Sequence, residues 1–136
     1  MDIVSKGGNL ALNLAPQPDG ELPAGAVASL RDMGRWLRMH GEGIYETDII
    51  KPYFERNVKY TAKNNIRYAF YLYDDCVRLP LRVYLTATED IKSVRLMRTG
   101  QEIPFKKQGS QLLLDTTDVD RNSAFYADCF ILEAMP

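Results

Sequence analysis

The chain has 136 residues, of which 46% are hydrophobic and 26% charged, a composition typical of a folded globular protein of about one domain. Its 17 basic and 18 acidic residues give a formal net charge of -1, so no overall positive field attracts nucleic acid or anionic membranes. No apolar run reaches the roughly 20 residues of a membrane-spanning helix. We therefore expect neither a nucleic-acid partner nor a membrane partner.

The residue types that bind soft metals are few. The chain has two cysteines, Cys76 and Cys129, and one histidine, His40. Each cysteine lies in an apolar stretch far from the other, so buried free thiols are at least as well favoured as a disulfide. One histidine without a cysteine cluster does not make a zinc site. We expect no metal and no cofactor.

The first predicted element is a strand over residues 9–15. Leu10, Leu12 and Leu14 share one face of this segment, and small or amide side chains share the other, which is the two-residue period of a strand. Residues 16–20 then contain two prolines and an Asp-Gly pair. Because proline removes main-chain donors and Asp-Gly favours tight turns, we expect the strand to end there.

A helix is predicted next. Pro23 suits a first helical turn, and apolar residues then recur at intervals of three and four, at Val27, Leu30, Met33 and Leu37. His40 and Gly41 favour a helix end, because a cationic side chain complements the last carbonyl groups and glycine turns freely.

The apolar period changes to two after about residue 56. Turn-forming residues separate short alternating runs, which predict six or seven strands joined by antiparallel hairpins. These runs are Val58/Tyr60/Ala62, Ile66/Tyr68/Phe70/Leu72, Leu79/Leu81/Val83/Leu85, Val94/Leu96, Leu112/Leu114 and Tyr126/Phe130/Leu132. The expected fold is mostly β, an antiparallel β-sandwich of six to eight strands preceded by one strand and one α-helix.

In residues 2–45, the identities of the residues are more specific than their apolar periodicity. The segments that carry it are 2–16 (DIVSKGGNLALNLAP), 18–20 (PDG), 34–37 (GRWL) and 41–45 (GEGIY). Their order and spacing resemble the end of the catalytic barrel in glycoside hydrolase family twenty-nine α-L-fucosidases. The resemblance implies that residues 1–50 are the terminal strand and helix of a (β/α) barrel, and that residues 51–136 are a C-terminal β-sandwich domain.

The same resemblance implies a function. The family's aspartate nucleophile and glutamate acid/base lie upstream of the matching region, so we expect no catalytic residue in this chain. Three positions depart from the family: Ala15 and Glu46 stand where glycine is usual, and His40 where asparagine is common. The implied role is to close and brace the barrel of a retaining fucosidase. Its partners would be the missing catalytic barrel and, through the complete enzyme, fucosylated glycan in a secreted, periplasmic or lysosomal setting.

Asn13 is a candidate substrate-adjacent residue, because it would lie near the carboxyl end of a barrel strand, where such enzymes place their sites. A hydrogen bond to nearby main chain explains Asn13 equally simply. The tyrosines of the β-rich part are a second candidate, a platform for sugar rings made of Tyr68, Tyr71, Tyr73 and Tyr84. Cross-strand packing is the plainer explanation of these aromatic residues.

Two alternatives to the bracing role remain open. The chain could be a non-catalytic carbohydrate-binding module that uses the tyrosine platform. It could also be an oligomerising domain, since a lone strand with three leucines favours a homo-oligomer formed through residues 9–15.

Overall fold

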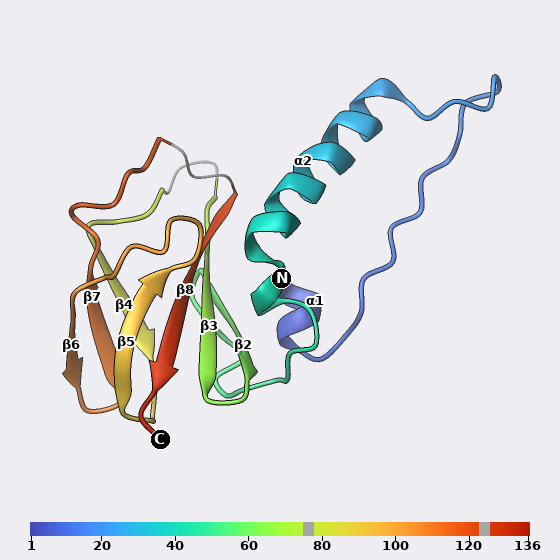
Figure 1. The fold of residues 1–136 in the computed structure, drawn as a ribbon. Coiled ribbons are helices and arrows are strands. Elements are labelled where there is room, and N and C mark those ends of the chain that lie inside the picture. Colours follow the sequence, from blue (N-terminus) through green and yellow to red (C-terminus); the bar gives the residue numbers. More distant parts are fainter. Residues whose placement is uncertain (75–77, 123–125) are drawn as a thin grey trace.

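The computed structural model describes residues 1–74, 78–122 and 126–136. Within them, eight strands form a sandwich, and a long helix leads away from one side of it together with the segment before the helix (Figure 1). No helix in these ranges is both long and apolar enough to cross a membrane. The elements are α1 (Asp2–Ser5), α2 (Ala24–His40), the 3-10 helix η1 (Gly41–Gly43), β1 (Phe54–Glu55), β2 (Val58–Lys63), β3 (Ile66–Leu72), β4 (Arg82–Thr86), β5 (Ile91–Leu96), β6 (Phe105–Gln108), β7 (Gln111–Asp115) and β8 (Ala127–Ala134).

The strands form a five-stranded sheet with the order β1-β2-β3-β8-β5 and a three-stranded sheet with the order β4-β7-β6. Every pairing between neighbouring strands is antiparallel. The two sheets face each other across an apolar core to which β8 contributes Phe130 and Leu132, and β7 contributes Leu112 and Leu114. The predicted antiparallel β-sandwich is confirmed.

The five-stranded sheet is covered on both faces. Successive side chains of a strand point to opposite faces, so Phe130 and Leu132 of β8 face the three-stranded sheet, whereas Cys129 and Ile131 belong to a second apolar cluster on the other face. Residues 127–132 of β8 are consequently all buried. This explains why β8 has an almost continuous apolar sequence and lacks the alternation of a half-exposed strand.

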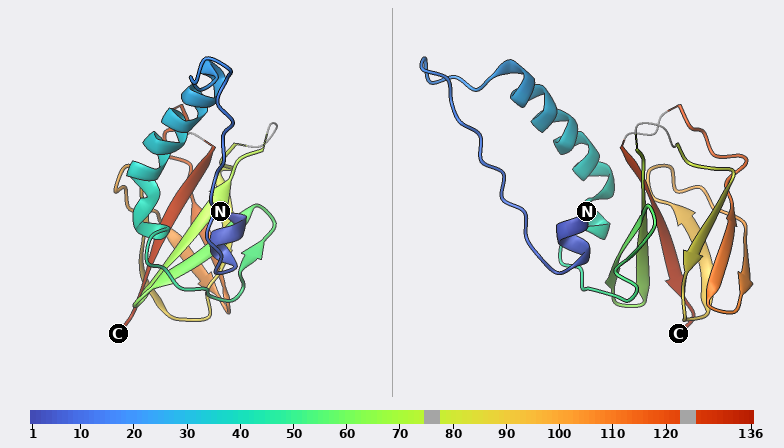
Figure 2. Two further views of the ribbon diagram at one scale, coloured as in Figure 1. Left: turned by 90° about the vertical axis from the view of Figure 1, so that its right-hand side faces the viewer. Right: turned by 180° about the vertical axis from the view of Figure 1, so that it is seen from behind.

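The carboxyl end of α2 anchors the helix on this second face. Trp36 packs against Phe70 with a ring separation of 5.9 Å, and its indole Nε1 donates a hydrogen bond of 3.2 Å to the carbonyl oxygen of Ala127. His40 stacks on Trp36 at 4.6 Å, and η1 follows directly. The predicted helix is confirmed with Pro23 immediately before it, and the views in Figure 2 show that only its carboxyl end reaches the sandwich.

A buried ion pair lies inside the sandwich near one end of β8. Arg98 donates from Nε to Asp128 Oδ1 at 2.6 Å, and the Tyr73 hydroxyl donates to Asp128 Oδ2 at 2.5 Å. The side chains of Asp128 and Arg98 are 0% and 5% exposed. Burial, followed by the hydrogen bond to Asp128, raises the pKa of Tyr73. The carboxylate therefore joins the segment after β3, the segment after β5 and β8 itself.

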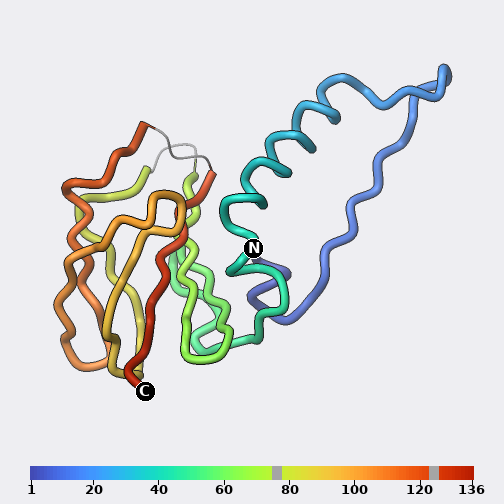
Figure 3. Tube along the Cα trace, viewed as in Figure 1, coloured from blue at the N-terminus to red at the C-terminus, as the bar shows by residue number. Residues whose placement is uncertain are grey.

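Residues 9–15, expected as a strand, are extended but belong to no sheet in the structure. The segment runs beside α2 and away from the sandwich (Figure 3). A strand needs neighbours for its main-chain hydrogen bonds, and no main-chain hydrogen bond joins residues 9–15 to the rest of the described chain. The alternating sequence therefore adopts an extended conformation without strand pairing.

Candidate functional site

The first candidate surface is an apolar cavity of about 640 Å³ between residues 1–12 and α2, which we call the helix groove. Its apolar lining includes Leu10, Leu12, Leu30, Met33, Trp36 and Leu37. The leucines of the extended segment are largely open to solvent, with Leu10 56%, Leu12 54% and Leu14 40% exposed. Soluble proteins seldom leave such side chains clustered and uncovered, so this groove marks a contact surface.

Asn13 lies in the same extended segment and is exposed. Its neighbours Leu12 and Leu14 point to the opposite face of an extended chain. The substrate-adjacent role of Asn13 stays a prediction.

The four tyrosines singled out in the sequence do not share one face. Tyr68 is 1% exposed, lies in the cluster beneath α2, and donates a 2.9 Å hydrogen bond to Glu42. Tyr71 and Tyr73 point from the other face of the same sheet towards the sandwich core, with ring centroids 6.2 Å apart. Tyr84 projects from β4 and is 53% exposed. Residues 68 and 71 are an odd number apart on one strand, which places their side chains on opposite faces.

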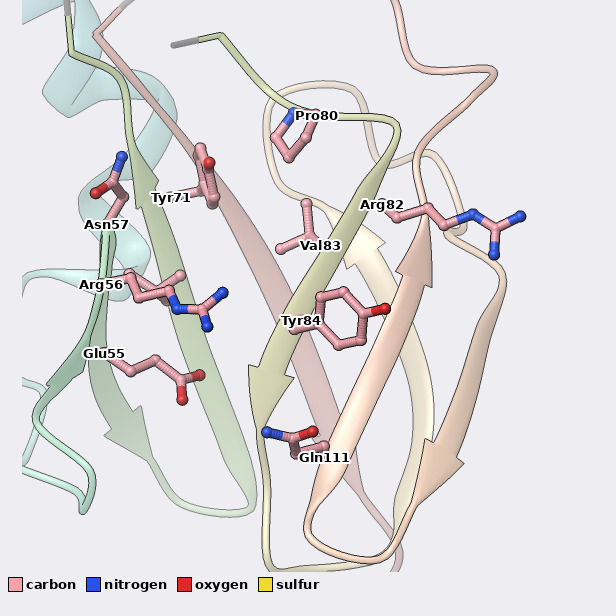
Figure 4. Close-up of a pocket in the computed structure, with 10 residues that line it drawn as sticks. Glu55, Arg56, Asn57, Tyr71, Pro80, Arg82, Val83, Tyr84 and Gln111 are labelled. Atoms are coloured by element: carbon pink, nitrogen blue, oxygen red, sulfur yellow. The ribbon is translucent and has the colours of Figure 1, made fainter.

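Tyr71 and Tyr84 nevertheless both line a second cavity, of about 530 Å³, which we call the edge groove (Figure 4). The turn between β1 and β2 forms one wall, and β4, an edge strand of the three-stranded sheet, forms the other. The polar side chains of the lining belong to Glu55, Arg56, Asn57, Arg82 and Gln111, in addition to the two tyrosines. The groove thus combines aromatic, amide and charged groups, a set that suits specific recognition of a polar ligand.

Glu55 ties the two walls of the edge groove together at one end. Its Oε1 accepts hydrogen bonds from the Tyr60 hydroxyl and from the Thr86 main-chain nitrogen, the latter at 2.8 Å, and its Oε2 accepts from the Thr86 hydroxyl at 2.7 Å. Burial and then the bond to Glu55 raise the pKa of Tyr60. These bonds use both oxygens of Glu55, so the carboxylate has a structural role.

The other carboxylates near the amino-terminal part also have structural contacts. Asp19 accepts a 3.0 Å hydrogen bond from the Glu21 main-chain nitrogen within the turn, Glu42 accepts from Tyr68, and Glu46 pairs with Lys63 at 3.1 Å. Asp48 forms a main-chain bridge with Ala62.

The thiols and the histidine are buried or lie outside the described ranges. Cys129 is a free, buried cysteine, and burial raises the pKa of its thiol. Cys76 lies outside the described residues. His40 is buried, its Nδ1 lies 3.1 Å from the carbonyl oxygen of Trp36, and burial lowers the pKa of its imidazole. His40 therefore serves the attachment of α2 to the sandwich.

Comparison with known proteins finds similarity to α-L-fucosidases in sequence and in structure. The sequence profile of the family described as Alpha-L-fucosidase matches residues 1–42. Plasma alpha-L-fucosidase of Rattus norvegicus is 40% identical over 81 residues, which cover 53% of this chain and 17% of that protein.

Solved structures match nearly the whole chain. The Thermotoga maritima alpha-fucosidase, solved in complex with a mechanism-based inhibitor, is 26% identical with a TM-score of 0.77, covering 97% of this chain and 32% of that one. The alpha-L-fucosidase isoenzyme 1 of Paenibacillus thiaminolyticus shares the fold with a TM-score of 0.82 at 24% identity, covering 98% of this chain and 32% of that one.

The chain spans about a sixth of the curated relatives' length and about a third of these structures. The family profile matches residues 1–42, whereas the structural match covers nearly the whole chain. In sequence and in fold, this chain is therefore similar to a part of the α-L-fucosidases.

Proposed function

We propose that this chain is the carboxyl-terminal region of a retaining α-L-fucosidase, in which it closes and braces the catalytic barrel without supplying the catalytic carboxylates. The helix groove is the observation that carries this proposal. In a complete barrel, a terminal strand and helix have parallel strands and helices on both sides. Residues 9–15 and α2 present the apolar surfaces that such neighbours would cover.

The energetics favour a partner for this groove. Fully burying a leucine side chain stabilises a protein by about 1.5–3 kcal/mol, and three leucines of residues 9–15 are 40–56% exposed. Docking of a barrel would also supply the main-chain hydrogen bonds that an extended segment lacks. A catalytic barrel satisfies both needs with one surface.

The sandwich supplies the brace in this proposal. Trp36 and His40 join α2 to the five-stranded sheet through stacking and a hydrogen bond to the main chain of β8. We assign residues 1–50 to the barrel and residues 51–136 to the C-terminal β-sandwich domain. Hydrolysis with retention needs two carboxyl groups about 5 Å apart across the glycosidic bond, which the barrel would provide. Fucosylated glycan would then be bound by the complete enzyme.

The isolated chain is expected to form a homo-oligomer through residues 9–15, since a second copy can cover the leucines that the barrel would cover. Leu12→Asp should shift this oligomer to a monomer in size-exclusion chromatography with light scattering. The melting temperature of the sandwich should barely change, because Leu12 is 54% exposed. Leu81→Asp is the matched control, since Leu81 is 58% exposed outside the helix groove. A wild-type chain that stays monomeric at high concentration would contradict this expectation.

A chimera tests the bracing role directly. Residues 1–136 would replace the equivalent carboxyl-terminal third of the Thermotoga maritima alpha-fucosidase. The chimera should hydrolyse an aryl α-L-fucoside, whereas the isolated chain should not. In the chimera, Leu12→Asp should lower the concentration of active sites at least about tenfold, because burying an unpaired carboxylate is costly.

Active sites would be counted with a covalent inhibitor, which separates loss of folded enzyme from slower turnover. The Leu81→Asp chimera is the control and should keep its active sites. A soluble, folded chimera without turnover, or one in which Leu12→Asp has no effect, would contradict the proposal.

A further inference from the structure

We propose that the edge groove binds a saccharide that carries an anionic group, a carboxylate or a sulfate, at a site separate from the helix groove. Figure 4 shows Glu55, Arg56 and Asn57 on one side of the groove and the lining residues of β4 on the other, with the Arg82 side chain extending from β4 towards β7. The cavity volume of about 530 Å³ lies within the range of about 300–1,000 Å³ typical of small-molecule sites. This inference needs no barrel, so it stands or falls independently of the bracing role.

Aromatic surface is available on both sides of the groove. Tyr71 enters from β3 and is partly buried against the sandwich core, whereas Tyr84 projects from β4 and is 53% exposed. Tyrosine offers an apolar ring face with a hydroxyl at its tip. The C–H face of a sugar ring can pack on the tyrosine ring, and the sugar hydroxyl groups can form hydrogen bonds with the tyrosine hydroxyl.

The main chain of β4 adds hydrogen-bonding groups. On the side that faces β7, the Leu81 carbonyl oxygen accepts a hydrogen bond from the Thr116 N–H, and the Ala87 N–H donates one to the Ser110 carbonyl oxygen. Because antiparallel strands alternate, the main-chain groups of Arg82, Tyr84 and Thr86 point to the free edge, towards the groove. Glu55 already occupies the Thr86 nitrogen. Within the described chain, the N–H and C=O groups of Arg82 and Tyr84 thus remain available for ligand hydroxyl groups.

The charge of the groove favours an anion. Arg56 and Arg82 both belong to its lining, and no ion pair or side-chain hydrogen bond holds the Arg56 guanidinium among the described residues. Arg82 lies opposite Asp115 in the β4–β7 ladder, and hydrogen bonds, followed by the charge of Arg82, lower the pKa of that carboxyl group. The single lining carboxylate, Glu55, is bound by Tyr60 and Thr86. Guanidinium groups bind carboxylate and sulfate oxygens with paired donors, so Arg56 is the charged partner that the groove offers to a ligand anion.

The backbone at Arg56 supports a functional reason for this arginine. Arg56 has a φ of 46°, a left-handed conformation that glycine or asparagine adopts more easily. Such strain at a non-glycine residue is often found at binding sites. The β1–β2 turn therefore presents a charged side chain where an unstrained glycine would form the turn without it.

A saccharide fits this groove better than a peptide strand. Strand addition needs a row of free edge groups, but Glu55 closes one end of β4 and Pro80, which has no main-chain donor, lies just before the other. Only Arg82 and Tyr84 remain between them. That length suits one or two sugar rings.

The binding test uses the 136-residue chain and calorimetric or NMR titration. The anionic probes are 3′-sialyllactose, which carries a carboxylate, and a 6-sulfated lactose, which carries a sulfate; lactose is the neutral reference. Either anionic sugar should bind at least about tenfold more tightly than lactose, which corresponds to one charge-assisted hydrogen bond. The two probes show which anion the groove prefers.

Arg56→Gly is the informative variant, because it removes the guanidinium and relieves the left-handed strain. It should weaken anionic sugar binding at least about tenfold while keeping or raising the melting temperature. Tyr84→Ala should weaken all sugars. Arg31→Ala, an exposed arginine on α2, is the control and should change nothing.

Equal affinity for lactose and the anionic sugars, or binding that survives Arg56→Gly in a folded chain, would overturn the proposal. So would an acidic extended peptide that binds more tightly than either anionic sugar and displaces it. None of these three results would affect the outcome of the chimera experiment.

Discussion

Asp128→Asn is expected to lower the free energy of unfolding by about 3–5 kcal/mol, the usual cost of removing one partner of a buried ion pair. The carboxylate accepts hydrogen bonds from Arg98 Nε at 2.6 Å and from the Tyr73 hydroxyl at 2.5 Å. Without it, the Arg98 guanidinium, only 5% exposed, loses its buried counter-charge and keeps its hydrogen bond to the carbonyl oxygen of Asp120. Chemical denaturation of the 136-residue chain would measure the change.

The double variant Asp128→Asn with Arg98→Met is the control for this prediction. It removes the Arg98 charge together with the Asp128 charge and leaves an amide oxygen that can still accept from the Tyr73 hydroxyl. Because replacing both members of a buried pair is often nearly neutral, the double variant should recover most of the lost stability. A single variant that costs less than about 1 kcal/mol would show that the ion pair is well hydrated.

Gly43→Ala is expected to lower the free energy of unfolding by about 1–3 kcal/mol, the usual cost of inserting a methyl group into a packed core. A Cβ at this position would lie 2.8 Å from Phe70 Cζ and 3.0 Å from Tyr68 Cγ. Both rings are buried, so neither can move without displacing α2 or the sheet. Loss of protection in amide hydrogen exchange should concentrate where α2 meets β3.

Gly25→Ala is the matched control, since a Cβ there meets no atom within 4 Å. Alanine within a helix is about 0.5–1 kcal/mol more favourable than glycine, so this variant should be neutral or stabilising. If Gly43→Ala were as well tolerated, the tight contact between η1 and the sheet would be wrong.

The sequence predicts the elements whose own residues have a clear apolar period. Strands such as Val58–Lys63 follow from apolar periodicity because they bury one face. The helix Ala24–His40 also follows from its apolar period, although His40 is its only buried residue. Neither β1 nor β6 follows from the apolar pattern of the sequence. β6 has only Phe105 as an apolar residue, and two-residue β1 exists through its pairing with β2. Such edge strands depend on a neighbour, which local sequence does not reveal.

The extended segment shows the converse limit. Residues 9–15 have the alternation of a strand, yet a strand forms only beside partners that supply its hydrogen bonds. Periodicity alone predicts an apolar surface here, and the neighbours that would cover it are part of the proposed function.

The candidate binding site was only partly predictable. Tyr71 and Tyr84 were singled out as aromatic residues, but their grouping with Tyr68 neglected that neighbouring residues of a strand alternate in direction. Arg56 was missed altogether, because a φ of 46° leaves no mark in the residue type. The following Asn57 is the one local hint of a turn.

The position of β8 determines when the five-stranded sheet can fold during synthesis on the ribosome. β8 lies between β3 and β5, with register from Ile66–Leu72 on one side and Ile91–Leu96 on the other. The five-stranded sheet therefore remains in two separate pieces until residues 127–134 have left the exit tunnel. Premature termination before residue 127 would leave these two pieces of the sheet unjoined.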